Sequence, residues 1–290
     1  MLYTIHNAKL CVTIESFGAE LQSIRGANGV EYLWQGDAKY WKDRALNIFP
    51  YVARLTNGQY EMDGKCYTLP IHGLAPTKEF VVTEQAEDKI VFTFANDEES
   101  YAHYPRKFVF HIVYALEGNV LKYTFLVENK DERKMYFGIG GHPGFNVPLD
   151  PAKQFTDYRI RFNEPCAPRS VGLTAACFLD GTDAPYVLDE GNVIPLKHSL
   201  FDHDAIVLKD MARSVTIEAD DGPSVTVRFP GMPYLGIWHM PHTDAPYVCI
   251  EPWCSLPSTQ DKIAVFEEQP DLISLDAGKV YENIWEIELN

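Results

Sequence analysis

The segment 247–257, YVCIEPWCSLP, places one carboxylate, Glu251, directly after four apolar residues. A carboxylate in this setting must be hydrogen-bonded, paired or functional, because removing its charge from water is costly and raises its pKa. We expect Glu251 to end a strand, because Pro252 cannot donate to a ladder and restricts the residue before it. The carboxylate then projects from a sheet end, where it either acts as a general base or pairs with an arginine.

A histidine, His142, stands in the segment GGHPGF, on backbone that glycine and proline constrain. Gly140 and Gly141 allow a close backbone approach or an unusual dihedral angle, and Pro143 fixes the conformation that follows. Imidazole is the side chain best matched to proton transfer near neutral pH, so His142 is a candidate acid–base residue. A lone histidine is nevertheless more often structural. His72, which precedes a glycine in YTLPIHGLAP, is a weaker candidate of the same kind.

Two further charged residues stand at the borders of predicted strands. Arg54 follows an aromatic, proline-containing run and precedes the turn residues TNG, a position that also suits an ordinary surface arginine. Asp204 directly precedes a predicted strand at 205–208, where its carboxylate could bind a ligand or accept backbone N–H groups at a turn. The neighbouring residues alone leave both interpretations open.

The segment WHMPH offers His239 and His242 as metal ligands, but Pro241 between them excludes the helical spacing of a zinc site. No carboxylate or thiol completes such a site at a standard spacing. The chain has no GxGxxG motif, no Walker loop and no GxSxG elbow, so nucleotide cofactors and common serine hydrolase chemistry have no support. We therefore expect neither a metal ion nor an organic cofactor.

The segments that position these residues have mainly the sequence pattern of β-strands. The segments 80–94, 108–129 and 214–229 alternate apolar and polar residues on both sides of a turn, which predicts three hairpins. Further strand-like runs lie at 10–15, 31–34, 135–140, 205–208, 234–239 and 280–289. Strands with turn signals at short intervals are typical of an all-β sandwich or closed β architecture. The segments 146–158 and 163–185 are expected to be long loops, of the kind that often line a site.

The composition favours a soluble, cytoplasmic protein. The 290 residues include 25 basic and 41 acidic side chains, and the net charge of −16 repels nucleic acid and anionic membrane surfaces. No run approaches the roughly 18 to 20 apolar residues that a membrane span needs, and the N-terminus has no signal-peptide pattern. The six cysteines are scattered without a CxxC pair, which favours reduced thiols. We expect a monomer or a homodimer.

Several short segments, taken together and in order, resemble the aldose 1-epimerase (galactose mutarotase-like) superfamily, and its LacX-like branch above all. They are SFGAELQSI, EYLWQGDAKYW, FPYVARLTNGQY, HGLA, GGHPGFNVPL, DHDAIVL, PYLGIWHMP and CIEPWCSLP, and they span nearly the whole chain. The resemblance implies an all-β fold, a large antiparallel β-sandwich called the supersandwich, as a single domain over residues 1–290. It also implies a site on a concave sheet face, with no metal or organic cofactor.

The resemblance further implies a reaction, the interconversion of the α and β anomers of a free sugar. Glu251 matches the family's general base, which takes the proton of the C1 hydroxyl, and His142 matches the general acid, which protonates the ring oxygen. His72 matches a second histidine near C1, while Arg54 and Asp204 match residues that bind sugar hydroxyls. We expect the acid and the base on opposite sides of the sugar, each contributing roughly 10²- to 10⁴-fold to the rate.

Aromatic side chains and one missing arginine bear on the substrate. Trp238 and Trp253 are candidates to cover the apolar face of a sugar, whereas Trp34 and Trp41 are expected to pack in the core. Many LacX-like and sugar-phosphate-specific relatives have an arginine where this chain has Pro76 in HGLAP. The arginine-glycine-rich segment of the phosphate-specific branch is also absent near RALNIFP. We therefore expect a neutral hexose, such as galactose or glucose, rather than a sugar phosphate.

Two other functions stay open on the sequence. The first is a non-catalytic carbohydrate-binding or regulatory protein that keeps the same fold and pocket. The second is a glycoside hydrolase that uses Asp204 and Glu251 as its carboxylate pair.

Overall fold

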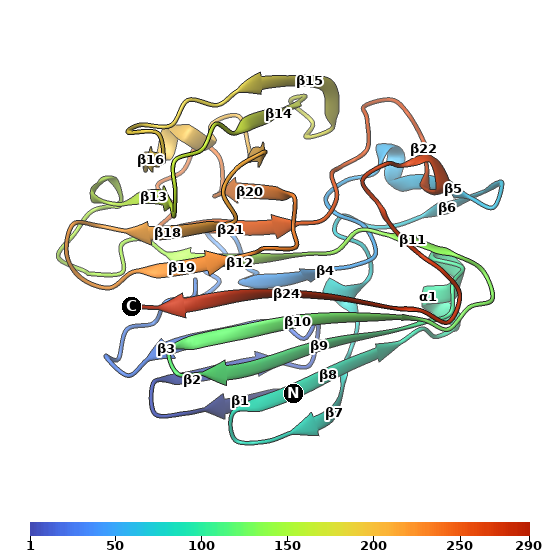
Figure 1. Ribbon diagram of the computed structural model, residues 1–290, viewed down its shortest axis with the longest axis horizontal. Coiled ribbons are helices and arrows are strands. Elements are labelled where there is room, and N and C mark those ends of the chain that lie inside the picture. Colours follow the sequence, from blue (N-terminus) through green and yellow to red (C-terminus); the bar gives the residue numbers. More distant parts are fainter.

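The computed structural model describes residues 1–290, and nearly all of its regular structure is antiparallel β-sheet (Figure 1). The largest sheet has nine strands in the spatial order β16-β13-β18-β19-β24-β10-β9-β8-β7. In chain order these strands are β7 (Val81–Gln85), β8 (Lys89–Ala95), β9 (Phe108–Glu117), β10 (Val120–Asn129), β13 (Arg159–Phe162), β16 (Val193–Pro195), β18 (Ser214–Glu218), β19 (Val225–Arg228) and β24 (Val280–Leu289).

A second sheet has seven strands in the spatial order β15-β14-β17-β20-β21-β12-β4. In chain order these strands are β4 (Ala45–Ile48), β12 (Gly140–Asn146), β14 (Arg169–Leu173), β15 (Leu179–Pro185), β17 (Ile206–Lys209), β20 (Tyr234–Trp238) and β21 (Tyr247–Trp253). Figure 1 draws β12 and β21 above β24, β10, β9 and β8. Side chains of both large sheets belong to one buried cluster, so the two sheets pack against each other.

Smaller elements cover the ends and edges of these layers. Three sheets are formed by β1 (Leu2–His6), β2 (Leu10–Glu15) and β3 (Leu21–Gly26); by β5 (Gln59–Met62), β6 (Lys65–Thr68) and β22 (Ala264–Val265); and by β11 (Met135–Phe137) and β23 (Ile273–Leu275). The helices are α1 (Glu98–His103) and the 3-10 turns η1 (Thr56–Gly58), η2 (Ala75–Thr77), η3 (Phe155–Asp157), η4 (His198–Phe201) and η5 (Phe266–Glu268).

The main core lies between the two large sheets, and it explains the apolar run before Glu251. Side chains alternate across a strand, and β21 turns Val248 and Ile250 into the same buried cluster that holds Trp285 of β24. Cys249 and Glu251 therefore point to the other face of the seven-stranded sheet. Every residue of β21 is buried, so both faces of this strand are covered.

Most of the predicted strands are confirmed, including the three hairpins, which are β7–β8, β9–β10 and β18–β19, and the long last strand, β24. The strand predicted at 31–34 is wrong, because only isolated bridges form there. The run 135–140 is divided between β11 and β12, which belong to different sheets. The loop predicted over 163–185 is also wrong, because it contains the β14–β15 hairpin. Most of β15 is exposed at a sheet edge, so its residues show no apolar alternation.

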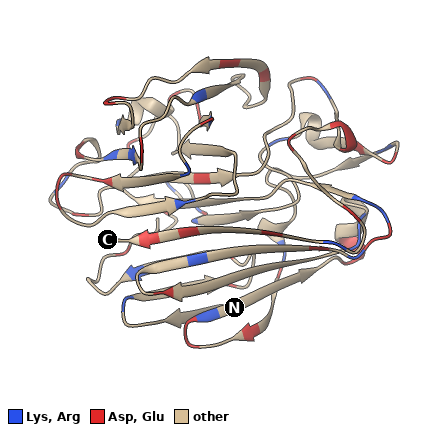
Figure 2. Cartoon of the chain, viewed as in Figure 1, with Lys and Arg blue, Asp and Glu red and all other residues tan.

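The charged residues lie mostly on loops and on the solvent-facing sides of strands. Figure 2 shows acidic and basic segments interspersed along the chain, in keeping with 41 acidic and 25 basic side chains. None of the helices has the length and the apolar composition that crossing a bilayer requires.

Candidate active site

The site forms where the pairing between two central strands is interrupted. β12 pairs with β21 at Gly140 and again from Gly144 onward, with no paired residues between them. Each strand has a proline in this interval, Pro143 in β12 and Pro252 in β21, and proline has no N–H to donate. On their other sides β12 stays paired with β4, and β21 with β20. Pairing is therefore absent only between β12 and β21 over this interval, and the seven-stranded sheet continues on both sides of it.

Two sequence predictions about strand ends are corrected here. The prediction that Glu251 ends a strand is wrong, because β21 continues through Pro252 to Trp253 in register with β20. Pro252 is tolerated because the pairing with β12 is already interrupted beside it. The strand-like run predicted at 135–140 stops before His142, whereas this residue lies within β12. Both side chains are thus fixed by central strands, which position them more rigidly than loops would.

The two glycines before His142 have the role that the sequence predicted, a close approach of the backbone. A Cβ atom on Gly140 would lie 2.7 Å from Cδ1 of Trp253, and one on Gly141 would lie 2.6 Å from Cζ2 of Trp285. These distances leave no room for a side chain at either position. Close contact with the two tryptophan rings therefore fixes the position of the β12 backbone, and with it the position of His142.

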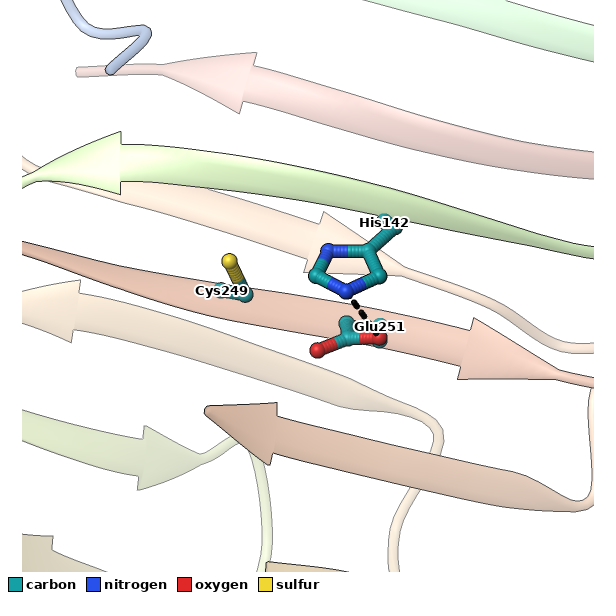
Figure 3. Close-up of side chains that lie close together, drawn as sticks. All are labelled: His142, Cys249 and Glu251. Atoms are coloured by element: carbon teal, nitrogen blue, oxygen red, sulfur yellow. Dashed lines mark ion pairs between the residues drawn. The ribbon is translucent and has the colours of Figure 1, made fainter. Parts of the chain in front are cut away.

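His142 and Glu251 contact each other at the floor of a cavity (Figure 3). Nε2 of His142 lies 3.2 Å from Oε2 of Glu251, and the side chains are 9% and 2% exposed. Oε2 of Glu251 and Nδ1 of His142 have no hydrogen-bond partner within the protein. The expectation that acid and base stand on opposite sides of a sugar is wrong, because no ring fits into a 3.2 Å gap. Both groups must reach a ligand from the same side.

Burial shifts the pKa of each group toward its uncharged form. Desolvation, with a smaller effect of the Asp204 charge, raises the pKa of Glu251 well above its usual value. Desolvation, with a smaller effect of His72, holds the pKa of His142 well below its usual range. Burial therefore disfavours both the carboxylate and the imidazolium, and so opposes the separated charges of an ion pair between these two groups.

His72 completes the polar floor from a turn rather than from a strand. Its φ of 63° is in the left-handed region, which a residue with a β-carbon adopts only when its surroundings hold it there. The backbone N–H of His72 donates to the carbonyl of Ala53 at 3.0 Å. The His72 ring stands nearly perpendicular to the ring of His142, with centroids 5.3 Å apart. Burial, with a smaller effect of Arg54, lowers the pKa of His72 to about 4, so the ring is neutral at pH 7.

The structure brings all seven residues predicted for the site around one cavity of about 250 Å³. They are Arg54, His72, His142, Asp204, Trp238, Glu251 and Trp253. This volume equals roughly eight liquid-water volumes and lies near the lower limit for small-molecule pockets. It therefore suits one sugar ring rather than an oligosaccharide.

The charged residues on the cavity wall differ in how firmly they are held. The Arg54 side chain is exposed and has no ion pair, so it is free to bind a ligand. Asp204 is held by two contacts, since Oδ1 accepts the N–H of Ala205 at 2.8 Å and Oδ2 accepts the S–H of Cys177 at 2.9 Å. The turn interpretation of Asp204 is confirmed, because its carboxylate accepts a backbone N–H group there. The same residue also lines the cavity, so ligand binding by Asp204 stays a prediction.

Aromatic rings form one wall, and one of them corrects a prediction. Trp34 is 5% exposed and packs in a buried cluster, as expected, but Trp41 is only partly buried: it packs against this cluster and also lines the cavity. The Trp41 ring lies 4.8 Å from the ring of His142 and stands edge-on to Trp238, with centroids 5.7 Å apart. Trp253 also lines the cavity, although it is only 4% exposed.

Three of the lining residues without a functional prediction from the sequence have side chains that could contact a ligand through a polar group or an aromatic ring: Trp41, Asp43 and Cys177. Trp41 and Asp43 lie in the segment GDAKYWKD, which has no strand periodicity, and Cys177 lies in the turn between β14 and β15. An aromatic residue within a charged loop is the one signal that could have indicated Trp41, because binding residues often lie on loops.

The metal interpretation of WHMPH gains no support from the structure, which uses its two histidines separately. His239 is fully buried and its Nε2 lies 3.1 Å from Nδ1 of His198, whereas Nδ1 of His242 lies 3.4 Å from Asp202. A different group of possible metal ligands does come together. The side-chain ligand atoms of His142, Cys249 and Glu251 lie within 4.8 Å of one another.

The fold and the site define a galactose mutarotase-like β-sandwich, with its pocket on one face of the seven-stranded sheet. The family model for aldose 1-epimerase matches residues 1–288, and the chain belongs to this family. The chain is 32% identical to "Protein LacX, chromosomal" of Lactococcus lactis subsp. lactis, over 96% of this chain and 97% of that protein.

Solved structures agree with this assignment. A galactose mutarotase related enzyme from Lactobacillus acidophilus is 32% identical, with a TM-score of 0.94 over 100% of this chain and 97% of that chain. A galactose mutarotase-like protein from Lactobacillus casei is 29% identical, with a TM-score of 0.93 and full coverage of both chains. A GalM/aldose epimerase homologue from C. elegans, 17% identical with a TM-score of 0.78 over 100% of this chain and 98% of that chain, shares the fold.

Proposed function

We propose that this protein interconverts the α and β anomers of a free hexose by acid–base ring opening and reclosure. The observation that carries the proposal is the contact between His142 and Glu251 at the floor of a cavity the size of one sugar ring. Membership of the aldose 1-epimerase family supports the same reaction class.

The close contact of the two groups suits this reaction. Ring opening removes the proton from O1, breaks the bond between C1 and the ring oxygen, and places a proton on that oxygen. Both oxygens are bonded to C1, so a base and an acid that lie side by side can serve them together. Rotation about the C1–C2 bond and reversed proton transfers then reclose the ring as the other anomer.

The proton count of the pair also matches the reaction. We assign Glu251 as the base for O1 and His142 as the acid for the ring oxygen, which requires one proton in total, held on the imidazole. In the empty cavity, burial disfavours both the carboxylate of Glu251 and the imidazolium of His142. A sugar hydroxyl that donates to the carboxylate favours its ionised form and so moves the proton toward His142.

The cavity wall would bind the rest of the sugar. Arg54 and Asp204 are placed to hold hydroxyl groups, and Trp238 and Trp41 to cover the apolar face of the ring. Arg54 is the only guanidinium or ammonium group on this wall, against three carboxyl groups, those of Asp43, Asp204 and Glu251. A phosphate dianion would meet more like charge than opposite charge here, so we propose a neutral hexose such as galactose or glucose.

Polarimetry with freshly dissolved α-glucose and α-galactose tests the proposal. We expect a saturable acceleration of the optical change toward the anomeric equilibrium, and its loss in His142→Asn. Saturable sugar binding without acceleration would overturn the proposal in favour of a carbohydrate-binding protein. Release of reducing sugar from a glycoside would instead favour a hydrolase that uses Asp204 and Glu251.

A further inference from the structure

A thiol lies beside the proposed catalytic pair and takes no part in the proposed reaction. Cys249 precedes Glu251 by two residues on β21, so both side chains point to the same face of the sheet. Figure 3 shows Cys249 gathered with His142 and Glu251 over the neighbouring strands β12 and β21. Cys249 is fully buried, and its sulfur makes no hydrogen bond to another group.

These three side chains form the ligand set of a zinc site. Zinc binds cysteine sulfur at about 2.3 Å, histidine nitrogen at about 2.0–2.1 Å and carboxylate oxygen at about 2.0–2.2 Å in a tetrahedron. Ligand atoms around such an ion lie roughly 3.4 to 3.7 Å apart. The His142–Glu251 contact of 3.2 Å is already close to this spacing, and the ligand atoms, all within 4.8 Å, need to approach by only about 1 Å.

The hydrogen bonding of the Glu251 carboxylate also points to a ligand at this place. Oε2 of Glu251, in a residue that is 1% exposed, makes no hydrogen bond, although Nε2 of His142 lies 3.2 Å away. An unpartnered buried oxygen is costly, and a cation above it would remove that cost. His142 and Glu251 line the cavity, which provides a path of entry, while Cys249 is buried beside them. The fourth position of a tetrahedral ion is open to water.

Charge balance favours a divalent ion that binds thiolate. The ligands bind as the thiolate of Cys249, the carboxylate of Glu251 and the neutral imidazole of His142. One Zn²⁺ with one thiolate and one carboxylate has no net charge, which suits a buried floor. Mg²⁺ prefers oxygen ligands in octahedral geometry and does not fit this set.

We propose that His142, Cys249 and Glu251 form a binding site for Zn²⁺ at the cavity floor, and that bound Zn²⁺ excludes the sugar. The ion occupies the two side chains that the proposed reaction needs, so it acts as an inhibitor and not as a cofactor. The binding site itself stands on the geometry of the three ligands and does not depend on the proposed function.

Titration of the metal-free protein with Cd²⁺, a spectroscopic substitute for Zn²⁺, tests the site directly. We expect a thiolate-to-metal charge-transfer band that saturates at one ion per chain, and competition by Zn²⁺ but not by Mg²⁺. Cys249→Ala is expected to lose the saturating band and to weaken Zn²⁺ binding by at least about 10- to 100-fold. Cys66→Ser, which removes an exposed thiol, is the matched control and should keep both.

Two further variants keep the test decisive if Cys249→Ala does not fold. His142→Asn and Glu251→Gln retain the thiol but remove another ligand, so each should weaken Zn²⁺ binding by a similar factor. A band of unchanged intensity in folded Cys249→Ala, or no saturable band in the wild type, would overturn the proposal. Absence of mutarotation with every sugar leaves these spectra unchanged, so the site and the proposed function fail separately.

Discussion

Replacing Glu251 by glutamine is the perturbation that isolates the proposed base. Glutamine has nearly the same shape but neither accepts nor donates the reacting proton. Because a positioned general acid or base contributes roughly 10²- to 10⁴-fold, we expect a loss of that size in kcat/KM. At 1.36 kcal/mol per tenfold, this corresponds to about 2.7 to 5.4 kcal/mol of lost transition-state stabilisation.

The structure also predicts that this loss does not come from unfolding. Burial raises the pKa of Glu251 in the folded state above its usual value of 4.5. For an acid shifted in this direction, folding stability is highest below pH 4.5 and declines as the pH rises toward the folded-state pKa. Glutamine has no such decline, so the Glu251→Gln variant should gain stability relative to wild type between pH 4.5 and pH 7.

The assay combines anomer exchange by polarimetry with thermal unfolding at pH 5 and pH 7. Glu128→Gln, on the opposite large sheet, is the matched control, because Glu128 bonds only to His111 and Lys130 and lies outside the cavity. The control should stay within about twofold of wild-type activity, a change of roughly 0.4 kcal/mol. A folded Glu251→Gln variant with activity within about threefold of wild type would refute the assignment of the base.

Three other predictions follow from the cavity. Arg54→Ala should raise KM roughly tenfold with little change in kcat, because a hydrogen bond from a charged group contributes about 1.5–3 kcal/mol to binding; steady-state kinetics would show this, and an unchanged KM would contradict it. Trp41→Ala should lower kcat/KM by roughly 2- to 10-fold, because an aromatic contact such as that between Trp41 and His142 contributes about 0.5–1.5 kcal/mol. Trp41→Phe should restore kcat/KM. Equal rates in the two variants would contradict a role of the Trp41 ring in contact with His142. The pKa of His72, lowered to about 4, means that stability is lost as the pH falls from 6.5 toward 4, by about 3 kcal/mol in total. His72→Gln should lack this loss, and urea unfolding at pH 7 and pH 4.5 that shows the same loss in variant and wild type would contradict the assignment.

The strands that could be predicted are those with one face in the core and one in water. β9, β10 and β24 alternate buried and partly exposed residues along their full lengths, and the sequence shows that alternation. β21 is buried on both faces and β15 is exposed on most of its length, so neither has a period of two to detect. The course of β21 through Pro252 could not be predicted, because it depends on the interrupted pairing with β12, a feature of two segments far apart in the chain.

The candidate site was predictable by residue type and family resemblance, but not by geometry. His142 and Glu251 are separated by more than 100 residues, and only the antiparallel pairing of β12 with β21 brings them into contact. Trp41 was assigned to the core because an isolated tryptophan carries no signal of the face it occupies. Cys249 stands in an apolar run, where a cysteine is usually interpreted as a small hydrophobic residue. Its position beside His142 and Glu251 becomes evident only once β21 is known to be a strand, because side chains two residues apart then lie on the same face.

A crystal structure with a bound hexose tests the central claim most directly, namely that His142 and Glu251 act from one side on the two oxygens of C1. The account predicts O1 within hydrogen-bond distance of the Glu251 carboxylate and the ring oxygen within hydrogen-bond distance of His142, with Arg54 and Asp204 on other hydroxyls. A hexose bound in the cavity with C1 turned away from both residues would contradict the claim.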